Sequence, residues 1–415
     1  MTDEPLRIVM LSDSGNTGGA GIAAARLAAG LQRRGHHVTR LLPRASGETD
    51  DTVGIAPLYS ISPGFRAAAR AARLAGPFWW SDYWFRTWLN DKLEHLQPDV
   101  ISVHNLHGGN WPPEFVSDCM AHAPTAWTLH DCWSFTGRCV YPAKCDKYLS
   151  GCDAGCPTAT EYPALSPARI APAWQRRQRV LDQNLALIGV TPSRWLQRMA
   201  QQGLWRGHEV KVIANGLSLD IYRPGDREQF RRELGIEAGP VMLAASHDLG
   251  DPRKGLGILM AALENWTQPL TVLTFGSGTV PFRLPKNVRL RELGPIHDEE
   301  RKMRIFNAAD IYVHPALEDN LPNTVAESIA CGTPVVAFDV GGLSEMVLPG
   351  ITGWLAGTPS AEALARTLAA AIESPVDRLQ CRRNAELRYD LERCSVEYED
   401  TLRRLAGRHI GVVTQ

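Results

Sequence analysis

The sequence predicts an α/β protein composed of two doubly wound parallel-sheet domains. Its 415 residues suit two or three domains of ordinary size, each large enough to bury a core of its own. Short apolar runs rich in β-forming residues alternate with segments of helical spacing, which is typical of βαβ units. Two loops that follow such runs are rich in glycine, and loops at the carboxyl ends of parallel strands are common ligand sites.

The composition argues against several classes of function. The chain has 44 basic and 45 acidic residues, so its net charge is close to zero and favours neither nucleic acid nor an acidic polymer as a partner. A hydrophobic content of 44% with 21% charged residues is typical of globular proteins. No apolar run reaches the roughly 18 residues of a membrane span, and the polar start precedes a strand, not a signal-peptide core. We therefore expect a cytoplasmic protein.

Residues 1–215 are expected to form the first domain, with a cysteine-rich insert at 132–156. The loop after its first strand contains Gly18, Gly19 and Gly21, which do not match GxGxxG. This loop either cradles a phosphate against a helix start or makes an ordinary tight turn. The expected strands are 6–13, 38–43, 98–105, 124–131, 185–191 and 210–214, the expected helices are 22–34, 174–183 and 193–202, and the proline-rich stretch 157–172 is expected to be irregular.

Residues 66–88 combine arginines with many aromatic side chains. Arg66, Arg70 and Arg73 would share one face of a helix, and the residues after them are rich in tryptophan. Such a pattern suits either a packed helical hairpin with exposed arginines or contact with a membrane surface. We expect the hairpin, and peripheral attachment to the inner face of the plasma membrane is the alternative.

Histidines stand at the ends of two predicted core strands. His104-Asn105 ends one of these strands and His130-Asp131 ends the other. A histidine at the carboxyl end of a parallel strand points toward the ligand crevice, where it can donate to a hydroxyl or a phosphate. We expect His130 to take this role, with His104 and His107 as weaker candidates.

Five cysteines follow the second histidine within 132–156. Four of them, Cys139, Cys145, Cys152 and Cys156, are the most plausible ligand set for a tetrahedral zinc ion. Their spacing lacks a CxxC pair, and only the last two lie close together. Three alternatives stay open: reduced or redox-active thiols, a structural zinc site, and disulfides.

Residues 216–390 are expected to form the second domain, beginning at an Asn-Gly turn. Arg253 and Lys254 precede a helix, where two cations could neutralise a diphosphate, and a solvated pair is the alternative. Gly276 follows the next strand and lets a ligand approach closely. The expected strands are 241–246, 270–275, 288–293, 310–315 and 334–338, and the expected helices are 298–309, 324–331, 361–372, 376–389 and 396–405.

The segment 310–347 is one βαβ unit with two candidate ligand loops. Its first loop contains Glu318 and Asp319, and Glu327 follows in the helix. Glu327 could accept a hydrogen bond from a ligand hydroxyl. In the alternative, it only completes a capping box with Thr324, and the two loop acids are merely solvated.

These residues resemble a known family. Asp319 and Glu327 are similar to the Glu-x7-Glu signature of the retaining glycosyltransferases of family 4, with Asp in place of the first Glu. The resemblance runs from the opening glycine-rich loop to about residue 390 and is strongest over 254–353. It implies the GT-B fold, in which an acceptor-binding first domain and a donor-binding second domain face a cleft. It also implies that the last helix, within 391–415, returns to the first domain.

The resemblance implies roles for individual residues. It places Arg253 and Lys254 on the diphosphate, and Asp319 and His130 on the donor sugar. The family's usual arginine, five residues before the lysine, is Leu249 here, so Arg253 would substitute for it. Further donor contacts are expected from Gly18, Gly19, Gly276, Glu327, Gly341, Gly342 and Leu343.

The activity implied is transfer of a hexose, with retention, from a nucleotide diphosphate sugar to a sugar or lipid-linked acceptor, without an obligatory metal. A role in bacterial cell-surface polysaccharide or glycolipid synthesis follows from the same resemblance. Two rivals share the fold: a nucleotide-sugar 2-epimerase, which needs no acceptor, and a non-catalytic nucleotide-sugar-binding scaffold. Asp319 motivates the second rival, because Asp shortens the reach of the carboxylate by about 1.5 Å.

Overall fold

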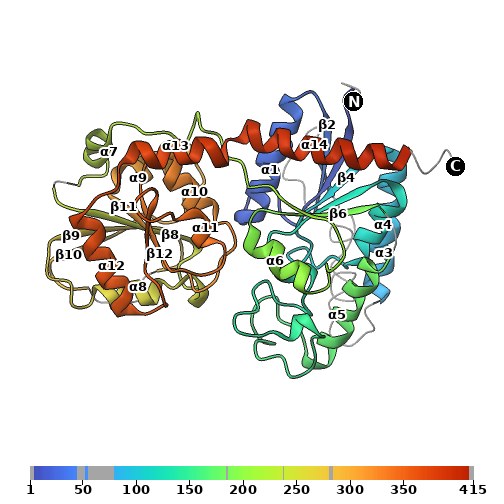
Figure 1. Ribbon diagram of the computed structural model, residues 1–415, viewed down its shortest axis with the longest axis horizontal. Helices are drawn as coiled ribbons and strands as arrows, with labels where there is room; N and C mark the ends of the chain where they lie inside the picture. Colours follow the sequence, from blue (N-terminus) through green and yellow to red (C-terminus); the bar gives the residue numbers. More distant parts are fainter. Residues whose placement is uncertain are drawn as a thin grey trace, which may run out of the picture. The chain divides into compact units, whose positions relative to one another are not determined.

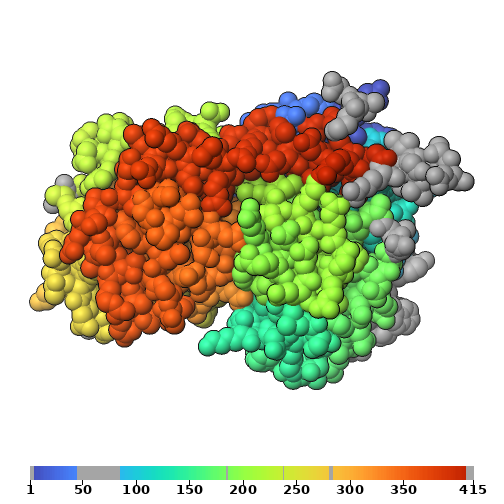
Figure 2. All heavy atoms as spheres, viewed as in Figure 1, coloured from blue at the N-terminus to red at the C-terminus, as the bar shows by residue number. Residues whose placement is uncertain are grey.

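The computed structural model describes residues 4–43, 52–54, 79–183, 186–236, 238–279 and 284–410. The chain divides into two compact units, Met1–Ile213 with Ser395–Gln415, and Ala214–Cys394. Each unit contains a parallel sheet with helices on both faces, which confirms the predicted fold class (Figure 1). In the space-filling view, the C-terminal segment, in red, runs along the surface of the first unit (Figure 2).

The sheet of the first unit has seven described strands in the order β3-β2-β1-β4-β5-β6-β7, and every pairing is parallel. In β1, Ile8 and Met10 belong to one core and Val9 and Leu11 to another, so both faces are buried. The strands are β1 (Arg7–Leu11), β2 (His37–Leu42), β3 (Thr52–Gly54), β4 (Val100–Val103), β5 (Thr125–Thr128), β6 (Leu187–Thr191) and β7 (Val210–Val212).

Helices α1 and α14 cover one face of this sheet, and α3, α4, α5 and α6 cover the other. Ala24 and Ala28 form part of the buried side of α1, where small side chains let the helix approach the strands. The helices are α1 (Gly18–Arg33), α3 (Trp79–Leu96), α4 (Glu114–His122), α5 (Pro167–Leu181), α6 (Arg194–Gln202) and α14 (Leu391–Ile410), with single turns η1 (Cys132–Ser134) and η2 (Lys147–Leu149).

The C-terminal helix α14 is part of the core of the first unit. The hydroxyl of Tyr398 lies 2.7 Å from the Oγ of Ser102 on β4 and 2.6 Å from the Oγ1 of Thr128 on β5. Leu402 and Leu405 are buried in the same core as α1. The last helix therefore closes one face of the N-terminal sheet.

The second unit has six described strands in the order β10-β9-β8-β11-β12-β13. In β12, Val335 and Ala337 join one core while Val336 joins the other, again because helices cover both faces. The strands are β8 (Val241–Asp248), β9 (Leu270–Ser277), β10 (Val288–Glu292), β11 (Ile311–His314), β12 (Val335–Ala337) and β13 (Gly353–Leu355). The helices are α7 (Arg227–Glu233), α8 (Leu256–Leu263), α9 (Glu299–Ala308), α10 (Asn323–Ala330), α11 (Leu343–Met346), α12 (Ala361–Glu373), α13 (Arg378–Tyr389) and the single turn η3 (Pro252–Lys254).

The strand order reverses once in each sheet. The chain builds outward from β1 to β3 and returns to place β4 on the other side of β1, and β11 is placed beside β8 in the same way. Open parallel sheets bind ligands outside the carboxyl ends of their strands at such a reversal. The polar side chains described below cluster at these two places.

Several elements differ from the sequence prediction. The proline-rich stretch is irregular only up to Ser166, because α5 begins at Pro167, where proline lacks only an N–H that would have no helical partner. The patterns also missed β3, α4, α7 and β13. Strand β13 opens on Gly353, a residue that normally argues against a strand, but here a Cβ would lie 1.8 Å from the carbonyl oxygen of Val335.

The segment predicted to contact a membrane is described only in part. Arg66, Arg70 and Arg73 lie outside the described residues. Arg86 on α3 forms a two-pronged ion pair with Asp118 of α4, at 2.8 and 2.7 Å, so this arginine holds two helices together. Within the described ranges, no helix is both long enough and apolar enough to span a bilayer.

Candidate functional site

A buried ion pair marks the reversal of strand order in the second unit. Lys254 ends η3 just after β8, and Asp319 lies in the loop after β11. Gly255 has φ +68°, and a Cβ there would lie 1.8 Å from the carbonyl oxygen of Pro315. Glycine therefore lets the turn press against the end of β11, which brings the Nζ of Lys254 to 2.6 Å from the Oδ2 of Asp319.

His314, the last residue of β11, completes this cluster. Its Nε2 lies 3.1 Å from the same Oδ2 of Asp319, and its Nδ1 lies 3.1 Å from the hydroxyl of Tyr312. Burial alone would raise the pKa of Asp319, but Lys254 and His314 hold it well below its usual value. Burial lowers the pKa of His314. The site therefore presents a carboxylate, an ammonium and a neutral imidazole within hydrogen-bond distance.

Arg253 faces the same loop as Lys254. Its Nη1 donates to the carbonyl oxygen of Glu318 at 2.9 Å, and its Nη2 lies 3.2 Å from the Oδ2 of Asp251. Leu249, at the position where the family has arginine, is buried. The structure thus brings together Arg253, Lys254 and Asp319, three of the four residues predicted to be catalytic.

Glu327 lies inside α10 and is 2% exposed. The capping-box alternative is wrong, because α10 begins at Asn323 after Pro322, with no side-chain cap. The hydroxyl of Thr324 instead accepts a hydrogen bond from Tyr312 at 2.9 Å. Glu327 is therefore a buried acid close to the loop of Asp319, and no role as a helix cap accounts for it.

The second predicted ligand loop packs on the first. Gly341 has φ +60°, and a Cβ there would lie 2.0 Å from the carbonyl oxygen of Asp319. The N–H of Gly342 donates to this same oxygen at 2.9 Å, and the N–H of Leu343 donates to Val340 at 3.1 Å. The glycines thus set the position of Asp319, and the N–H groups of Gly342 and Leu343 already have partners within the chain.

The remaining predicted glycines lie at the end of β9 and at the start of α1. Gly276, at the end of β9, has φ +143°, and a Cβ there would lie 1.9 Å from the carbonyl oxygen of Ser246. Gly18 and Gly19 open α1 in the first unit, and Gly18 has φ +68° with open space around its Cβ position. Gly276 is thus required by close packing, and Gly18 by its backbone conformation.

In the first unit, two histidines form a stacked pair at the strand-order reversal. The Nδ1 of His104 lies 2.9 Å from the Nε2 of His130, and the rings stack with centroids 5.2 Å apart. The Nε2 of His104 lies 3.2 Å from the Oγ of Ser102, which contacts Tyr398. Burial lowers the pKa of His130 to about 4, so the pair is neutral at neutral pH. A continuous chain of hydrogen bonds runs from His130 to helix α14.

A second polar group surrounds His107. Its Nε2 lies 2.9 Å from the Oδ2 of Asp131, and its Nδ1 lies 3.1 Å from the hydroxyl of Tyr162. Burial alone would lower the pKa of His107, but Asp131 and Asp13 raise it above its usual value. Asp13, at the end of β1, accepts from the N–H of Gly108 at 2.6 Å. This edge of the sheet can bind and polarise hydroxyl groups.

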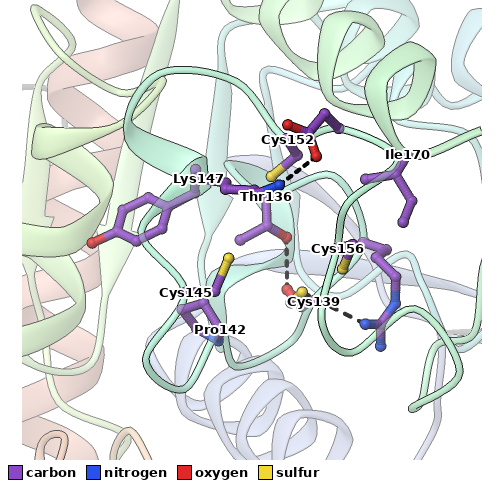
Figure 3. Close-up of a pocket in the computed structure, with 11 residues that line it drawn as sticks. Thr136, Cys139, Pro142, Cys145, Lys147, Cys152, Cys156 and Ile170 are labelled. Carbon is purple, nitrogen blue, oxygen red and sulfur yellow. Dashed lines mark hydrogen bonds and ion pairs between the residues drawn. The ribbon is translucent and has the colours of Figure 1, made fainter. Parts of the chain in front are cut away.

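The four predicted metal-ligating cysteines lie together in the loop between η1 and α5. Cys139, Cys145, Cys152 and Cys156 line one pocket (Figure 3). All four are free thiols, so the disulfide alternative is wrong for this structure. In the described part of the chain, no three His, Cys, Asp or Glu side chains are drawn together tightly enough to form a ligand cluster.

Sequence reasoning missed three of these residues. His314 lies in an apolar strand, and only the position of Asp319 shows that its ring faces the site. Asp13 and Asp131 are the last residues of the predicted strands 6–13 and 124–131, and this placement was the signal that could have singled them out. What the sequence could not show was that the ends of β1, β4 and β5 are neighbours.

Comparisons with known proteins agree with this architecture. A family model described as Glycosyltransferase Family 4 matches residues 17–221, and one described as Glycosyl transferases group 1 matches 226–388. The chain is 26% identical over 400 residues to a D-inositol 3-phosphate glycosyltransferase of Rhodococcus erythropolis, covering 89% of this chain and 84% of that protein. It is 28% identical over 254 residues to the putative colanic acid biosynthesis glycosyl transferase WcaC of Escherichia coli, covering 58% and 60%.

Solved structures share the fold. Sucrose-phosphate synthase from Thermosynechococcus elongatus has a TM-score of 0.73 at 18% identity, covering 97% of this chain and 99% of that one. HepE of Anabaena, in complex with UDP and glucose, has a TM-score of 0.65 at 18% identity, covering 96% and 99%. At such identities the likeness establishes the fold alone, and it confirms the predicted GT-B fold.

Proposed function

The chain belongs to the glycosyltransferases of family 4, and from this premise we propose that it is a retaining hexosyltransferase that uses a nucleotide diphosphate sugar. The observation that carries the proposal is the buried Lys254–Asp319 pair with His314. These groups lie at the carboxyl ends of β8 and β11, where open parallel sheets bind nucleotides and sugars.

The charges in this cluster suit a departing diphosphate. Lys254 and Arg253 would stabilise the negative charge that grows on the leaving group, which is often worth a few kcal/mol in the transition state. Asp319 contacts the ammonium of Lys254 and His314 contacts Asp319, so the cation is held in place and little reorganisation is required during the reaction. Glu327 would accept from the ribose hydroxyls, and Asp319 would contact the donor sugar.

The donor that we propose is a UDP-linked hexose. HepE, which shares the fold, was solved with UDP and with UDP-glucose. The departing phosphate would help to deprotonate the acceptor on the same face of the sugar, which preserves the anomeric configuration without an enzymatic nucleophile. This chemistry makes no use of a second carboxylate of the kind found in glycosidases.

The acceptor that we propose is a sugar hydroxyl of a growing surface polysaccharide or glycolipid. The named relatives act on a phosphorylated inositol or are assigned to colanic acid synthesis, which supports a hydroxyl-rich acceptor. His130, His107 and Asp131 lie at the edge of the first sheet and can donate to and accept from such hydroxyls. Contact of residues 66–88 with a membrane surface stays a prediction.

The test is a transfer assay with UDP-, GDP-, ADP- and dTDP-linked sugars on the wild type, Glu327→Gln and Glu362→Gln. Glu362 is an exposed acid of α12 and serves as the matched control. We expect thermal stabilisation by UDP-sugars and acceptor-dependent release of UDP in the wild type and the control, with both lost in Glu327→Gln.

The product and its anomeric configuration distinguish the rivals. NMR of the product should show the same configuration as the donor. Turnover of donor without acceptor would favour the 2-epimerase instead. Donor binding with neither transfer nor hydrolysis would favour a non-catalytic, nucleotide-sugar-binding scaffold protein.

A further inference from the structure

The loop between η1 and α5 brings four cysteines to one pocket. Between these elements the described chain has one regular element, the single turn η2. Such long irregular segments are uncommon in compact domains unless something else fixes them. Phe135 and Tyr148 provide one apolar anchor, with ring centroids 5.5 Å apart. A cross-link at the cysteines would fix the rest of the loop.

The thiols share polar neighbours as well as the pocket. The Oγ1 of Thr158 lies 3.5 Å from the Sγ of Cys139 and 3.7 Å from the Sγ of Cys156. The N–H of Gly137 donates to the Sγ of Cys152 at 3.1 Å, and a Cβ at Gly137 would lie 2.8 Å from the Cβ of Cys152. Hydrogen-bond donors that point at sulfur commonly surround metal-bound thiolates, where they orient and stabilise the ligand.

A buried cation lies next to this loop. Arg177 is 3% exposed, and its Nε has no acceptor among the described residues. Its Nη1 donates to the carbonyl oxygens of Gly137 and Ala173, at 3.3 and 2.8 Å. Burial and the neighbouring Arg176 lower the pKa of Arg177, whereas Cys152, Glu114 and Asp131 raise it, so a charge on Cys152 would stabilise this guanidinium further. Gly137 contacts both groups: its N–H donates to the sulfur of Cys152, and its carbonyl oxygen accepts from Arg177.

We propose that Cys139, Cys145, Cys152 and Cys156 bind a structural zinc ion through four thiolates. Such a centre has a net charge of about −2, and positive charge is supplied by Arg138, whose Nη1 lies 3.6 Å from the Sγ of Cys139, and by Arg177 beside Cys152. Zinc prefers tetrahedral sulfur ligands and needs no open position in a structural role. This proposal is independent of the proposed transferase activity.

The ligand set is chosen by position. Cys132 lies in the same segment but does not line the pocket, whereas the other four do (Figure 3). Cys152 and Cys156 are separated by three residues, within the spacing of paired zinc ligands. Among the described residues the four sulfurs are not drawn into a ligand cluster, so zinc binding would have to bring them closer together.

The decisive measurement is the metal content of the full chain purified under reducing conditions. Elemental analysis of the wild type should show about one zinc per chain, and cobalt(II) exchanged for it should give the visible bands of a tetrahedral thiolate complex. Cys145→Ser should lose most of the zinc. Cys132→Ala, the matched control from the same segment, should keep it.

Thiol modification supplies a second readout that does not depend on how the variants fold. In the wild type, these four thiols should resist alkylation until a mercurial or a strong chelator releases the zinc. Wild-type protein without metal and with all four thiols reactive would overturn the proposal. A mass showing disulfides among the four, or iron with acid-labile sulfide, would overturn it as well.

Discussion

The Nζ of Lys254 lies 2.6 Å from the Oδ2 of Asp319, in a site where the aspartate side chain is only 8% exposed and the lysine 21%. Removing one member of such a pair leaves the other charge buried without its main partner, whereas removing both leaves none. Stability and catalysis should therefore respond differently to single and double substitutions here.

We predict that Lys254→Met lowers the free energy of unfolding by about 3 kcal/mol, the low end for a buried pair because the lysine is partly exposed. Lys254→Met combined with Asp319→Asn should recover much of this loss, because no unpaired charge remains. Transfer should stay low in both variants, since the cation is absent. Urea unfolding and UDP release provide the two readouts, and additive losses of stability in the double variant would contradict the prediction.

Gly341→Ala should lower the free energy of unfolding far more than Gly357→Ala, although the two glycines have nearly the same φ. A Cβ at Gly341 would lie 2.0 Å from the carbonyl oxygen of Asp319, and neither backbone segment can yield easily. Gly357 has φ +59° with open space around it, so Gly357→Ala should lose only the roughly 1–2 kcal/mol of a left-handed conformation. Thermal unfolding of the two variants compares them, and equal losses would show that the close approach is not rigid.

His130→Gln should reduce the loss of folding free energy that occurs as the pH falls below about 6.5. Burial lowers the pKa of His130 to about 4 in the folded state, whereas an unfolded histidine titrates near 6.5. The folded state therefore binds fewer protons, and stability is lost as the pH falls from 6.5 to about 4. The loss amounts to about 3 kcal/mol, shared with the coupled His104.

His107→Gln is the matched control, because the pKa of His107 shifts in the opposite direction to that of His130. The pKa of His107 is raised in the folded state, so its contribution is fully present below about pH 6.5 and disappears as the pH rises through the folded-state pKa. This variant should lower stability by a constant amount on the acid side, without changing the slope there, and should remove the fall in stability above about pH 6.5. Urea unfolding at a series of pH values measures both, and an unchanged acid limb in His130→Gln would refute the assignment.

Tyr398→Phe should destabilise the first unit by about 1–3 kcal/mol, because Ser102 and Thr128 lose a buried hydroxyl partner. Tyr389 is also buried, but its hydroxyl has no partner among the described residues, so Tyr389→Phe should be close to neutral. Calorimetry on both variants tests the contrast. Similar losses would mean that ring packing, and not the hydroxyl, dominates at position 398.

The sequence predicted the fold class because alternation of apolar strands and helices is a local signal. It failed where local signals mislead. Pro167 starts a helix although proline-rich stretches usually indicate loops, and Gly353 lies in a strand. Gly353 depends on a neighbour distant in sequence, because its close approach to Val335 leaves no room for a Cβ.

The candidate site was predictable in part for the same reason. Asp319 and Lys254 were recognised from loop position and family resemblance, but their direct contact follows from the adjacency of β8 and β11. His314 was missed because its strand pattern is uniformly apolar around it. The capping box failed because α10 starts at Asn323, two residues earlier than a cap at Thr324 requires.

The position of α14 has a consequence for biosynthesis. Tyr398, Leu402 and Leu405 belong to the core that also contains β1 and α1, although the second unit separates them in the sequence. A ribosome therefore releases the N-terminal sheet long before the residues that close its face are made. During that interval an apolar face of the nascent chain is uncovered, so it is a natural binding site for a chaperone. A premature stop codon near residue 395 would leave this face permanently uncovered.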